Sequence, residues 1–178
     1  MSDHAEPSWL DADQQRTWLT LGGMLARLPA AIDAQLQRDA QLSHFEYQVL
    51  AGLSMAPERT LRMSVLAAFA EGSLARLSQV VARLEKRDWV RRTPDPVDGR
   101  FTLAILTDSG MDKVVATAPG HVAEVRRLVF DTLTKAQQRQ LYDIGRRIVR
   151  AIDPDDPCLD GLPFDTAASA TGRPAPDE

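Results

Sequence analysis

Cysteine is almost absent from this sequence. A single residue, Cys158, occurs in 178, which excludes an internal disulfide and a cysteine-rich zinc site within one chain. Cys158 stands among prolines and aspartates near the C-terminus, with no adjacent Lys, Arg or His to activate its thiol. We therefore interpret it as a bystander rather than a redox sensor.

Histidines and catalytic motifs are also scarce. The sequence has neither a glycine-rich phosphate loop with its lysine nor a Gly-x-Ser-x-Gly turn. No two of its histidines are spaced to share a metal ion. We therefore expect no enzyme, no cofactor and no metal site. The three histidines are His4, His44 and His121.

Long apolar runs are missing as well. No segment approaches the roughly 18 uninterrupted apolar residues of a membrane span, and Met1 to Pro7 lacks the apolar centre of a signal peptide. With 44% hydrophobic and 26% charged residues, the composition predicts a soluble cytoplasmic protein with one domain and no membrane partner.

Basic residues are fewer than acidic residues in the whole chain, but they are concentrated in one region. The net charge is −4, yet seven acids and one base lie beyond residue 152, and the first 152 residues carry 20 basic against 18 acidic side chains. Residues 73–107 hold seven basic and four acidic residues. A basic region within an acidic chain is compatible with nucleic-acid binding.

Apolar residues at spacings of three and four predict long helices on both sides of this region. The first begins near Asp11 or Asp13 and carries Trp18, with a kink expected at Pro29. Its apolar stripe exceeds what one core needs, so a partner subunit is expected to cover part of it. A capping box, Ser43 with Glu46, opens the next helix.

The basic region begins with a short strand near residues 61–63, a brief helix, a turn at Gly72 and a second helix from Ser73 to about Arg87. The second helix is amphipathic. Its predicted buried face carries Leu74, Leu77, Val81 and Leu84, and its predicted outward face carries Arg76, Gln79, Arg83 and Lys86.

Two strand-like runs follow, at 89–93 and 101–106. The seven residues between them exceed a tight hairpin turn, so the segment with Asp98 and Gly99 is expected to project as a wing. Thr107 and then a Thr134–Gln137 capping box open two more helices. The first meets Pro119–Gly120, where a kink or break is expected, and the second ends at Asp153–Pro154.

This pattern predicts a mainly α protein with a small β-hairpin wing (α+β). We expect a mobile N-terminus at 1–10, one domain at 11–152 and a disordered acidic tail at 153–178. The core of the domain is expected at 61–107.

A basic-faced helix after a glycine turn fits the major groove of double-stranded DNA. Arg76 and Gln79 are the leading candidates to read bases, with Ser78 next. Arg100 on the wing is suited to the minor groove, with Asp98 holding it by a charged hydrogen bond. The other predicted DNA-binding residues, several of them at phosphates, are Ser73, Arg83, Lys86, Arg91, Arg92 and Gly99.

The order of helices, the run from Leu84 to Arg92, the wing from Asp95 to Arg100 and the segment from Leu106 to Gly110 resemble the MarR family of winged helix-turn-helix regulators. The resemblance implies a homodimer joined by N- and C-terminal dimerisation helices, and 73–87 as the recognition helix. The sequence departs from the family pattern at Asp88, where glycine is common and a left-handed conformation is needed, and at Arg76, where a small hydroxyl residue is common.

The resemblance also implies release from DNA by a small, often phenolic, effector in a cleft between the dimerising helices and the winged domain. Trp18, His44 and Tyr47 are the candidates to line it. Packing is the alternative role for these aromatic residues. For the whole chain, the alternative to a dimeric repressor of a pseudo-palindromic operator is a winged-helix module that binds protein or senses a ligand without binding DNA.

Overall fold

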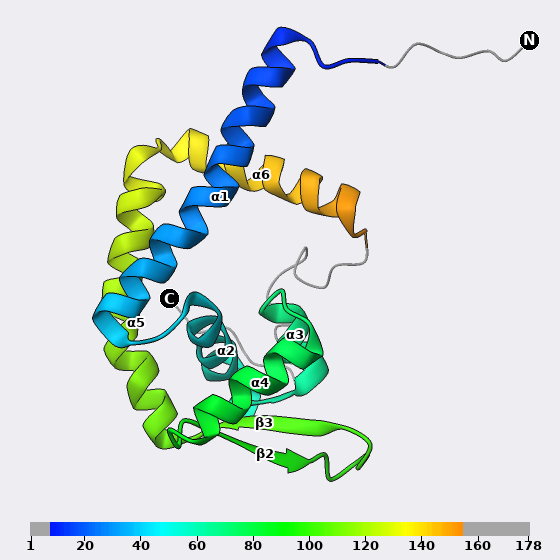
Figure 1. Ribbon diagram of the computed structural model, residues 1–178, viewed down its shortest axis with the longest axis vertical. Helices are drawn as coiled ribbons and strands as arrows, with labels where there is room; N and C mark the ends of the chain where they lie inside the picture. Colours follow the sequence, from blue (N-terminus) through cyan, green and yellow to red (C-terminus); the bar gives the residue numbers. More distant parts are fainter. Residues whose placement is uncertain (1–7, 155–178) are drawn as a thin grey trace, which may run out of the picture.

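The computed structural model describes residues 8–154, which form helices and one small sheet (Figure 1). This confirms the predicted fold class. The predictions for residues 1–7, for most of the acidic tail and for Cys158 lie outside the described residues. The elements are α1 (Ala12–Ala40), α2 (His44–Met55), η1 (Pro57–Arg59), β1 (Thr60–Arg62), α3 (Met63–Phe69), α4 (Leu74–Glu85), β2 (Val90–Pro94), β3 (Thr102–Leu106), α5 (Asp108–Leu128), η2 (Phe130–Thr132) and α6 (Lys135–Ile152).

Side-chain caps begin most of these helices. Asp11, Ser43 and Thr134 each form a capping box with the residue three positions later. Ser73 and Thr107 accept a hydrogen bond from a first-turn amide of α4 and α5. Each cap satisfies an amide that the helix start leaves free, and all five helix starts are as predicted.

The sheet is antiparallel, with strand order β1-β3-β2. In the hairpin, Val90 pairs with Leu106 and Pro94 with Thr102, so the wing loop spans residues 95–101. Asp88, just before β2, has a φ of 57°, which confirms the left-handed conformation required there. At Gly110 a Cβ would lie 2.1 Å from the Trp89 carbonyl oxygen, so a side chain at 110 would push α5 off the hairpin.

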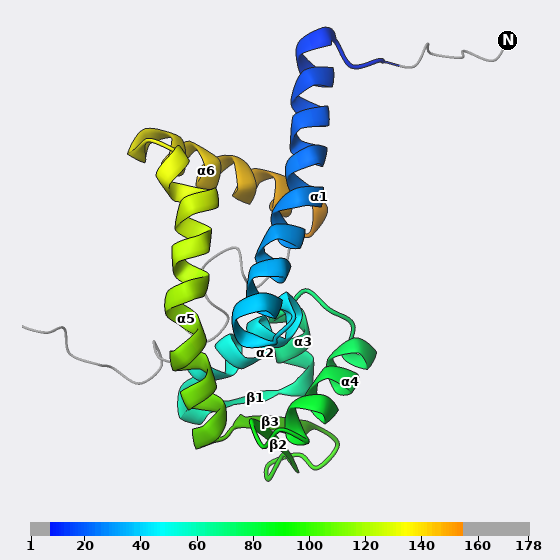
Figure 2. The same ribbon diagram turned by 60° about the vertical axis from the view of Figure 1, so that its left-hand side comes forward.

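Most of the core lies in residues 42–107, which we call the winged half. Its fully buried side chains include Leu50, Leu66, Leu77 and Leu84, and Leu36 from the end of α1 packs with them. Figures 1 and 2 show α1 and α5 extending together from the winged half, with α6 at the far end. We call residues 12–31 of α1, η2 and α6 the distal helices.

The distal helices are little buried. α6 has no buried residue, and its apolar stripe of Leu141, Ile144, Ile148, Val149 and Ile152 is exposed, with Ile144 at 54%. Neither α1 at Pro29 nor α5 at Pro119–Gly120 is interrupted, so the break considered for α5 does not occur.

Within residues 8–154, no single helix is long and apolar enough to cross a membrane. The helices α3 and α4 reach that length and hydropathy only when taken together, but they are bent by 103° to each other and packed into the core.

Candidate nucleic-acid interface

The helix α4 is fixed to the winged half through Leu77, Val80, Val81 and Leu84, all buried. Leu74, predicted for the same face, is 54% exposed. It lies one turn before the packed part of the helix and borders the wing instead. The other predicted core positions, Leu77, Val81 and Leu84, are buried as expected, and Val80 is buried with them.

Gln79 and Lys86 of the predicted outward face are exposed, while Ser78 is half-buried on the side of the wing. Gln79 and Lys86 are seven residues apart, two turns of helix, and so lie on one line along the surface. Their side chains point away from the core, as a helix in a groove requires.

Arg76 and Arg83 do not share that line. The guanidinium of Arg76 lies over the Phe45 ring, 4.0 Å from its centroid, and Nε of Arg83 donates to Oε1 of Glu46 at 3.3 Å. Both partners come from the first turn of α2. Both arginines are exposed, as the predicted outward face requires, but each also has a partner on α2 that the α4 periodicity cannot reveal.

The carboxylate of Glu46 is held in the orientation in which it binds Arg83. Its carboxylate also accepts hydrogen bonds from the Ser43 amide at 2.9 Å and the Ser43 hydroxyl at 3.1 Å, and it is buried. Burial by itself raises the pKa of Glu46, but these bonds and Arg83 together bring it below its ordinary value. The group is therefore a carboxylate at neutral pH, with a fixed orientation.

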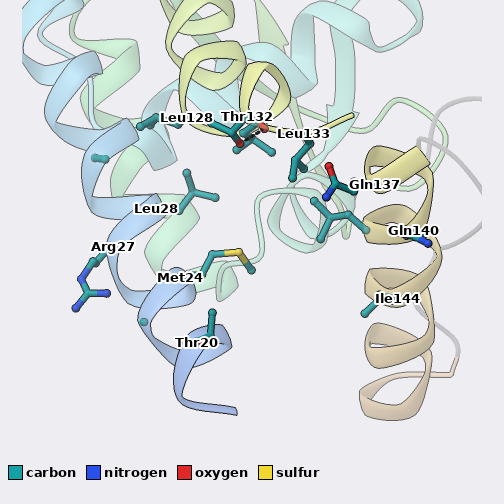
Figure 3. Close-up of a pocket in the computed structure, with 14 residues that line it drawn as sticks. Thr20, Met24, Arg27, Leu28, Leu128, Thr132, Leu133, Gln137, Gln140 and Ile144 are labelled. Carbon is teal, nitrogen blue, oxygen red and sulfur yellow. Dashed lines mark hydrogen bonds between the residues drawn. The ribbon is translucent and has the colours of Figure 1, made fainter. Parts of the chain in front are cut away.

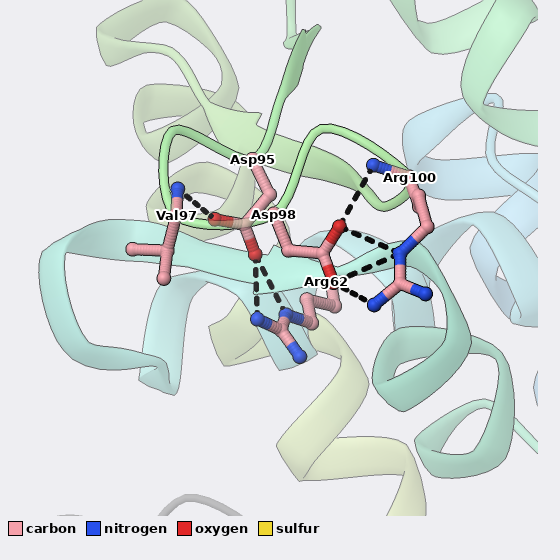
Figure 4. A network of polar contacts seen from close by, with 5 residues as sticks. All are labelled: Arg62, Asp95, Val97, Asp98 and Arg100. Atoms are coloured by element: carbon pink, nitrogen blue, oxygen red, sulfur yellow. Dashed lines mark hydrogen bonds and ion pairs between the residues drawn. The ribbon is translucent and has the colours of Figure 1, made fainter.

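The wing holds Arg100 as predicted (Figure 4). Asp98 accepts from Nε of Arg100 at 2.9 Å and from Nη2 at 2.6 Å. This pairing, with the amide of Arg100, keeps the pKa of Asp98 below its ordinary value. The Arg100 side chain is nevertheless 85% exposed, so it is oriented by Asp98 while one side remains open to a ligand.

A second pair, Arg62 with Asp95, anchors the wing loop to the sheet (Figure 4). Nη2 of Arg62 lies 2.7 Å from the buried Asp95 carboxylate, which also accepts from the Val97 amide at 2.9 Å. Hydrogen bonds from Val97 and then Arg62 lower the pKa of Asp95. The guanidinium of Arg62 also lies 4.4 Å from the centroid of the Phe101 ring.

The base of the hairpin carries two different arginines. Arg92 is clamped by Glu85, the last residue of α4, through its amide at 3.0 Å and through Nη2 at 2.6 Å. The side-chain bond from Arg92 lowers the pKa of Glu85. Arg91 is exposed and forms no ion pair within residues 8–154, so of the two it is the freer to meet a phosphate.

These elements enclose a groove of about 420 Å³ between α4 and the wing. Three arginines line it, each held by its own carboxylate, together with hydroxyl groups from α3, α4 and β3. The lining residues are Arg62, Met63, Ser64, Leu74, Ser78, Arg92, Arg100, Phe101 and Thr102. The predicted DNA-binding residues Ser78, Arg92 and Arg100 are thus brought together, whereas Ser73 serves as the cap of α4.

The predicted effector residues are not brought together. His44 and Tyr47 lie near His121 of α5, with Tyr47 and His121 ring centroids 4.5 Å apart. Trp18 lies fifteen residues before Asp33, the α1 residue that the His44 amide contacts, which is about 22 Å along a helix. Trp18 therefore belongs to the distal helices, and only His44 and Tyr47 can share a site.

Two hollows on this side of the molecule are large enough for a small ligand, and His44 lines one of them. His44 lines a pocket of about 490 Å³ with Asp33, Phe45, Glu71 and Arg76. A larger apolar groove of about 740 Å³ runs between α1 and α6 (Figure 3), where Met24 and Leu28 face Ile144. The apolar groove belongs to the exposed surface that the sequence assigned to a partner subunit.

Sequence reasoning missed Arg62, Phe45 and His121 as parts of these sites. Arg62 had a weak signal, because it stands in a three-residue strand beside the wing. The pairings of Phe45 with Arg76 and of Tyr47 with His121 had none, since they join segments 31 and 74 residues apart. In the described part of the chain, no three His, Cys, Asp or Glu side chains are grouped to hold a metal ion.

Comparison with known proteins identifies the family. The sequence pattern of the MarR family matches residues 40–100. The chain is 45% identical to Sco3205, a MarR family transcriptional regulator from Streptomyces coelicolor solved in complex with DNA; the match covers 84% of this chain and 94% of that one, with a TM-score of 0.81.

The chain belongs to the MarR family of transcriptional regulators. AbsC, a MarR family regulator from the same organism, is 30% identical, with a TM-score of 0.79 over 84% of this chain and all of AbsC. An uncharacterized HTH-type regulator of Bacillus subtilis, YdcH, is 32% identical over 80 residues, 44% of this chain and about half (54%) of that relative. Membership in the MarR family confirms the family resemblance drawn from the sequence.

Proposed function

We propose that this chain is a homodimeric, sequence-specific DNA-binding repressor that a small-molecule effector releases from a pseudo-palindromic operator. One observation carries the proposal: the side of α4 that carries Ser78 and the wing arginine Arg100 border the same groove. A helix and an adjoining wing with a fixed, exposed guanidinium match the major groove and the neighbouring minor groove of double-stranded DNA. Sco3205, at 45% identity, was solved with DNA bound.

In this proposal, residues 11–152 act as one domain around the winged core at 61–107. Gln79 and Ser78 meet base edges, and Arg100 enters the minor groove under the control of Asp98 and Gly99. Lys86, Arg91 and Arg92 meet phosphates, and Ser73 fixes the start of α4. Arg92 is the weaker of the phosphate candidates because Glu85 already neutralises it.

The homodimer accounts for the distal helices. Trp18, Leu19 and Leu25 of α1 and most of the α6 stripe are exposed, and burying such surface against a second copy is favourable in proportion to its area. A two-fold dimer places two α4 helices on one face of DNA, with half-sites about 10 base pairs apart.

We assign the effector to the pocket beside His44. The pocket beside His44 lies between α1, α2 and α4, so an occupant contacts both the long helices and the recognition helix. Tyr47 is not among the residues that line this pocket, and its ring packs on His121 of α5. Release of bound DNA by salicylate, used as a simple phenolic probe, would support the assignment if His44→Ala abolished the release.

The test of the central proposal is selection from a random-sequence duplex pool by the purified full chain. An enriched two-fold symmetric sequence, bound more tightly than a scrambled duplex at physiological salt, is the expected result. Failure to enrich any sequence would refute sequence-specific binding, and binding of the enriched duplex by a monomer would refute the homodimer.

A further inference from the structure

The first turn of α2 contacts three other helices through successive residues. The His44 amide donates to Oδ1 of Asp33 on α1 at 2.7 Å, and Tyr47 packs on His121 of α5. Between them, Phe45 lies against Arg76 and Glu46 binds Arg83, both on α4. This short segment, residues 44–47, therefore joins the recognition helix to the two long helices.

The two contacts with α4 are well placed to define its position. Arg76 and Arg83 are seven residues apart, so they lie on one flank of α4 about 10 Å from each other along its axis. Two attachment points at that separation restrain both rotation of α4 about its axis and sliding along it. Rotation matters because Gln79 and Lys86 lie on the adjoining face.

The α2 partners are themselves rigid. Glu46 is bound to Ser43 in the capping box of α2, and the Phe45 ring is 6% exposed and packed so closely that a Cβ at Gly72 would lie 2.5 Å from it. Neither side chain has room to follow α4 if α4 moves. Through these two contacts, the position of α2 therefore restrains the position of α4.

The charge of Arg83 is shared with Glu46 before DNA arrives. Its Nε binds a carboxylate that is 9% exposed, while the Arg83 side chain itself is 55% exposed, so a phosphate approaching Arg83 would compete with Glu46. Lys86, one turn further along the outward face, forms no ion pair within residues 8–154. Phosphate binding is therefore expected at Lys86 and not at Arg83.

We propose that Phe45 and Glu46 are positioning residues that set the rotation of α4 through Arg76 and Arg83, and that Arg83 is not a phosphate contact. This inference rests on the proposed DNA-binding function. It assigns to α2, which does not touch DNA in this proposal, a direct effect on which bases α4 reads.

The experiment compares Glu46→Gln, Arg83→Ala and the double variant with the wild-type full chain. Binding is measured on the duplex enriched from the random pool and on a scrambled duplex of the same length, over a series of KCl concentrations. Lys86→Ala is the matched control, since it removes a cation from the same end of α4. Cooperative thermal unfolding confirms that each variant is folded.

If the inference is correct, each single variant weakens binding to the enriched duplex on the order of tenfold, the scale of one lost base contact. The double variant is no worse than either single variant, because both break the same pair. The salt slope on the scrambled duplex stays unchanged for Arg83→Ala, whereas Lys86→Ala lowers it by about 0.9, the value for one phosphate.

The inference is overturned if Arg83→Ala lowers the salt slope by about 0.9 on both duplexes while Glu46→Gln leaves affinity unchanged. Should Glu46→Gln not fold, Arg83→Ala decides the question by the same slope, and Phe45→Leu tests the second attachment while keeping an apolar side chain in the core. If the wild-type chain binds the scrambled duplex but no enriched sequence emerges, specific recognition fails and the salt slopes still decide the role of Arg83.

Discussion

The winged half and the distal helices bury their apolar side chains in different ways. In the winged half, leucines from α2, α3 and α4 are completely enclosed within one chain. In the distal helices, α6 has a regular apolar stripe but no buried residue. Most helical stability in proteins comes from packing of the apolar face, and α6 has no such packing within one chain. The winged half is thus completed by its own sequence, whereas the distal helices fit the proposed homodimer.

The largest effect is expected from charges on the α6 stripe. Ile144→Asp with Ile148→Asp should make the protein monomeric, because carboxylates cannot be buried unpaired at an apolar interface. Operator affinity should fall by two orders of magnitude or more, since the second recognition helix no longer binds as part of the same molecule. Light scattering and gel-shift titration measure the two effects.

The control for this variant is Arg139→Asp, which adds a carboxylate to an exposed polar position of the same helix. It should leave the dimer intact. A double variant of Ile144 and Ile148 that remains dimeric would show that α6 is not part of the subunit interface.

The second-largest effect distinguishes burial within one chain from burial against a partner subunit. Leu50→Ala, in the core of the winged half, should reduce the free energy of unfolding by about 2 to 5 kcal/mol through lost contacts and a cavity. This loss should be largely independent of protein concentration. The cost of Ile144→Ala should instead appear as a shift in the concentration dependence of unfolding, because its contacts come from the partner.

Urea unfolding at several protein concentrations provides the measurement for both variants. The comparison would fail if Ile144→Ala destabilised the chain equally at all concentrations, since that would place its contacts within one subunit.

A smaller effect is expected at the wing. Arg100→Ala should weaken operator binding on the order of tenfold, as the loss of one groove contact does, without changing dimer formation. Arg91→Ala is the contrasting variant: it should weaken binding to all sequences alike and lower the salt slope by about 0.9.

Fluorescence-anisotropy titrations with the operator and with a scrambled duplex separate these outcomes. An Arg100→Ala variant with wild-type affinity at fixed salt would remove the wing arginine from the interface. A change of sequence preference in Arg91→Ala would reverse the two roles.

The smallest effect is expected where the two parts meet, at His44 and His121. Burial lowers the pKa of both imidazoles below 6.5; Asp33 and Glu71 partly oppose this for His44, while His44 lowers the pKa of His121 further. The unfolded chain therefore binds protons more readily than the folded one. The stability associated with these groups is complete above pH 6.5 and is lost as the pH falls below it.

Unfolding free energies measured by urea titration at pH 7.5 and pH 5.5 test this expectation, and His121→Gln should reduce the difference. The carboxylates with lowered pKa values, such as Glu46 and Glu85, lose their contribution only below about pH 4.5, so they do not obscure the result. Stability that is constant or higher at pH 5.5 would contradict the assignment.

Features that depend on neighbouring residues were predictable from the sequence. The capping boxes at Ser43 and Thr134, the caps at Ser73 and Thr107, the hairpin and the Asp98–Arg100 pair all join residues close in the chain. Because a cap or a wing pair is selected by local geometry, its residue types carry most of the information. The left-handed Asp88 was anticipated from the family resemblance instead, since glycine is common at that position.

The orientation of α4 was decided only by the tertiary structure. Its periodicity showed a basic side but did not reveal that Glu46, 37 residues before Arg83, would hold that arginine. The periodicity also did not show that Leu74 would be exposed and border the wing instead of packing in the core. A periodic pattern defines which residues share a face of one helix. Which partner each side chain contacts depends on the segments that the rest of the chain packs beside that helix.

By itself, then, the sequence determined the helices, most of their caps, the wing and an excess of apolar surface on the first long helix. The tertiary structure decided which cations of α4 are paired with α2, and it separated Trp18 from His44 and Tyr47. The physical reason is range: backbone hydrogen bonds and helix periodicity act over a few residues, whereas ion pairs and ring contacts join segments that only folding brings together.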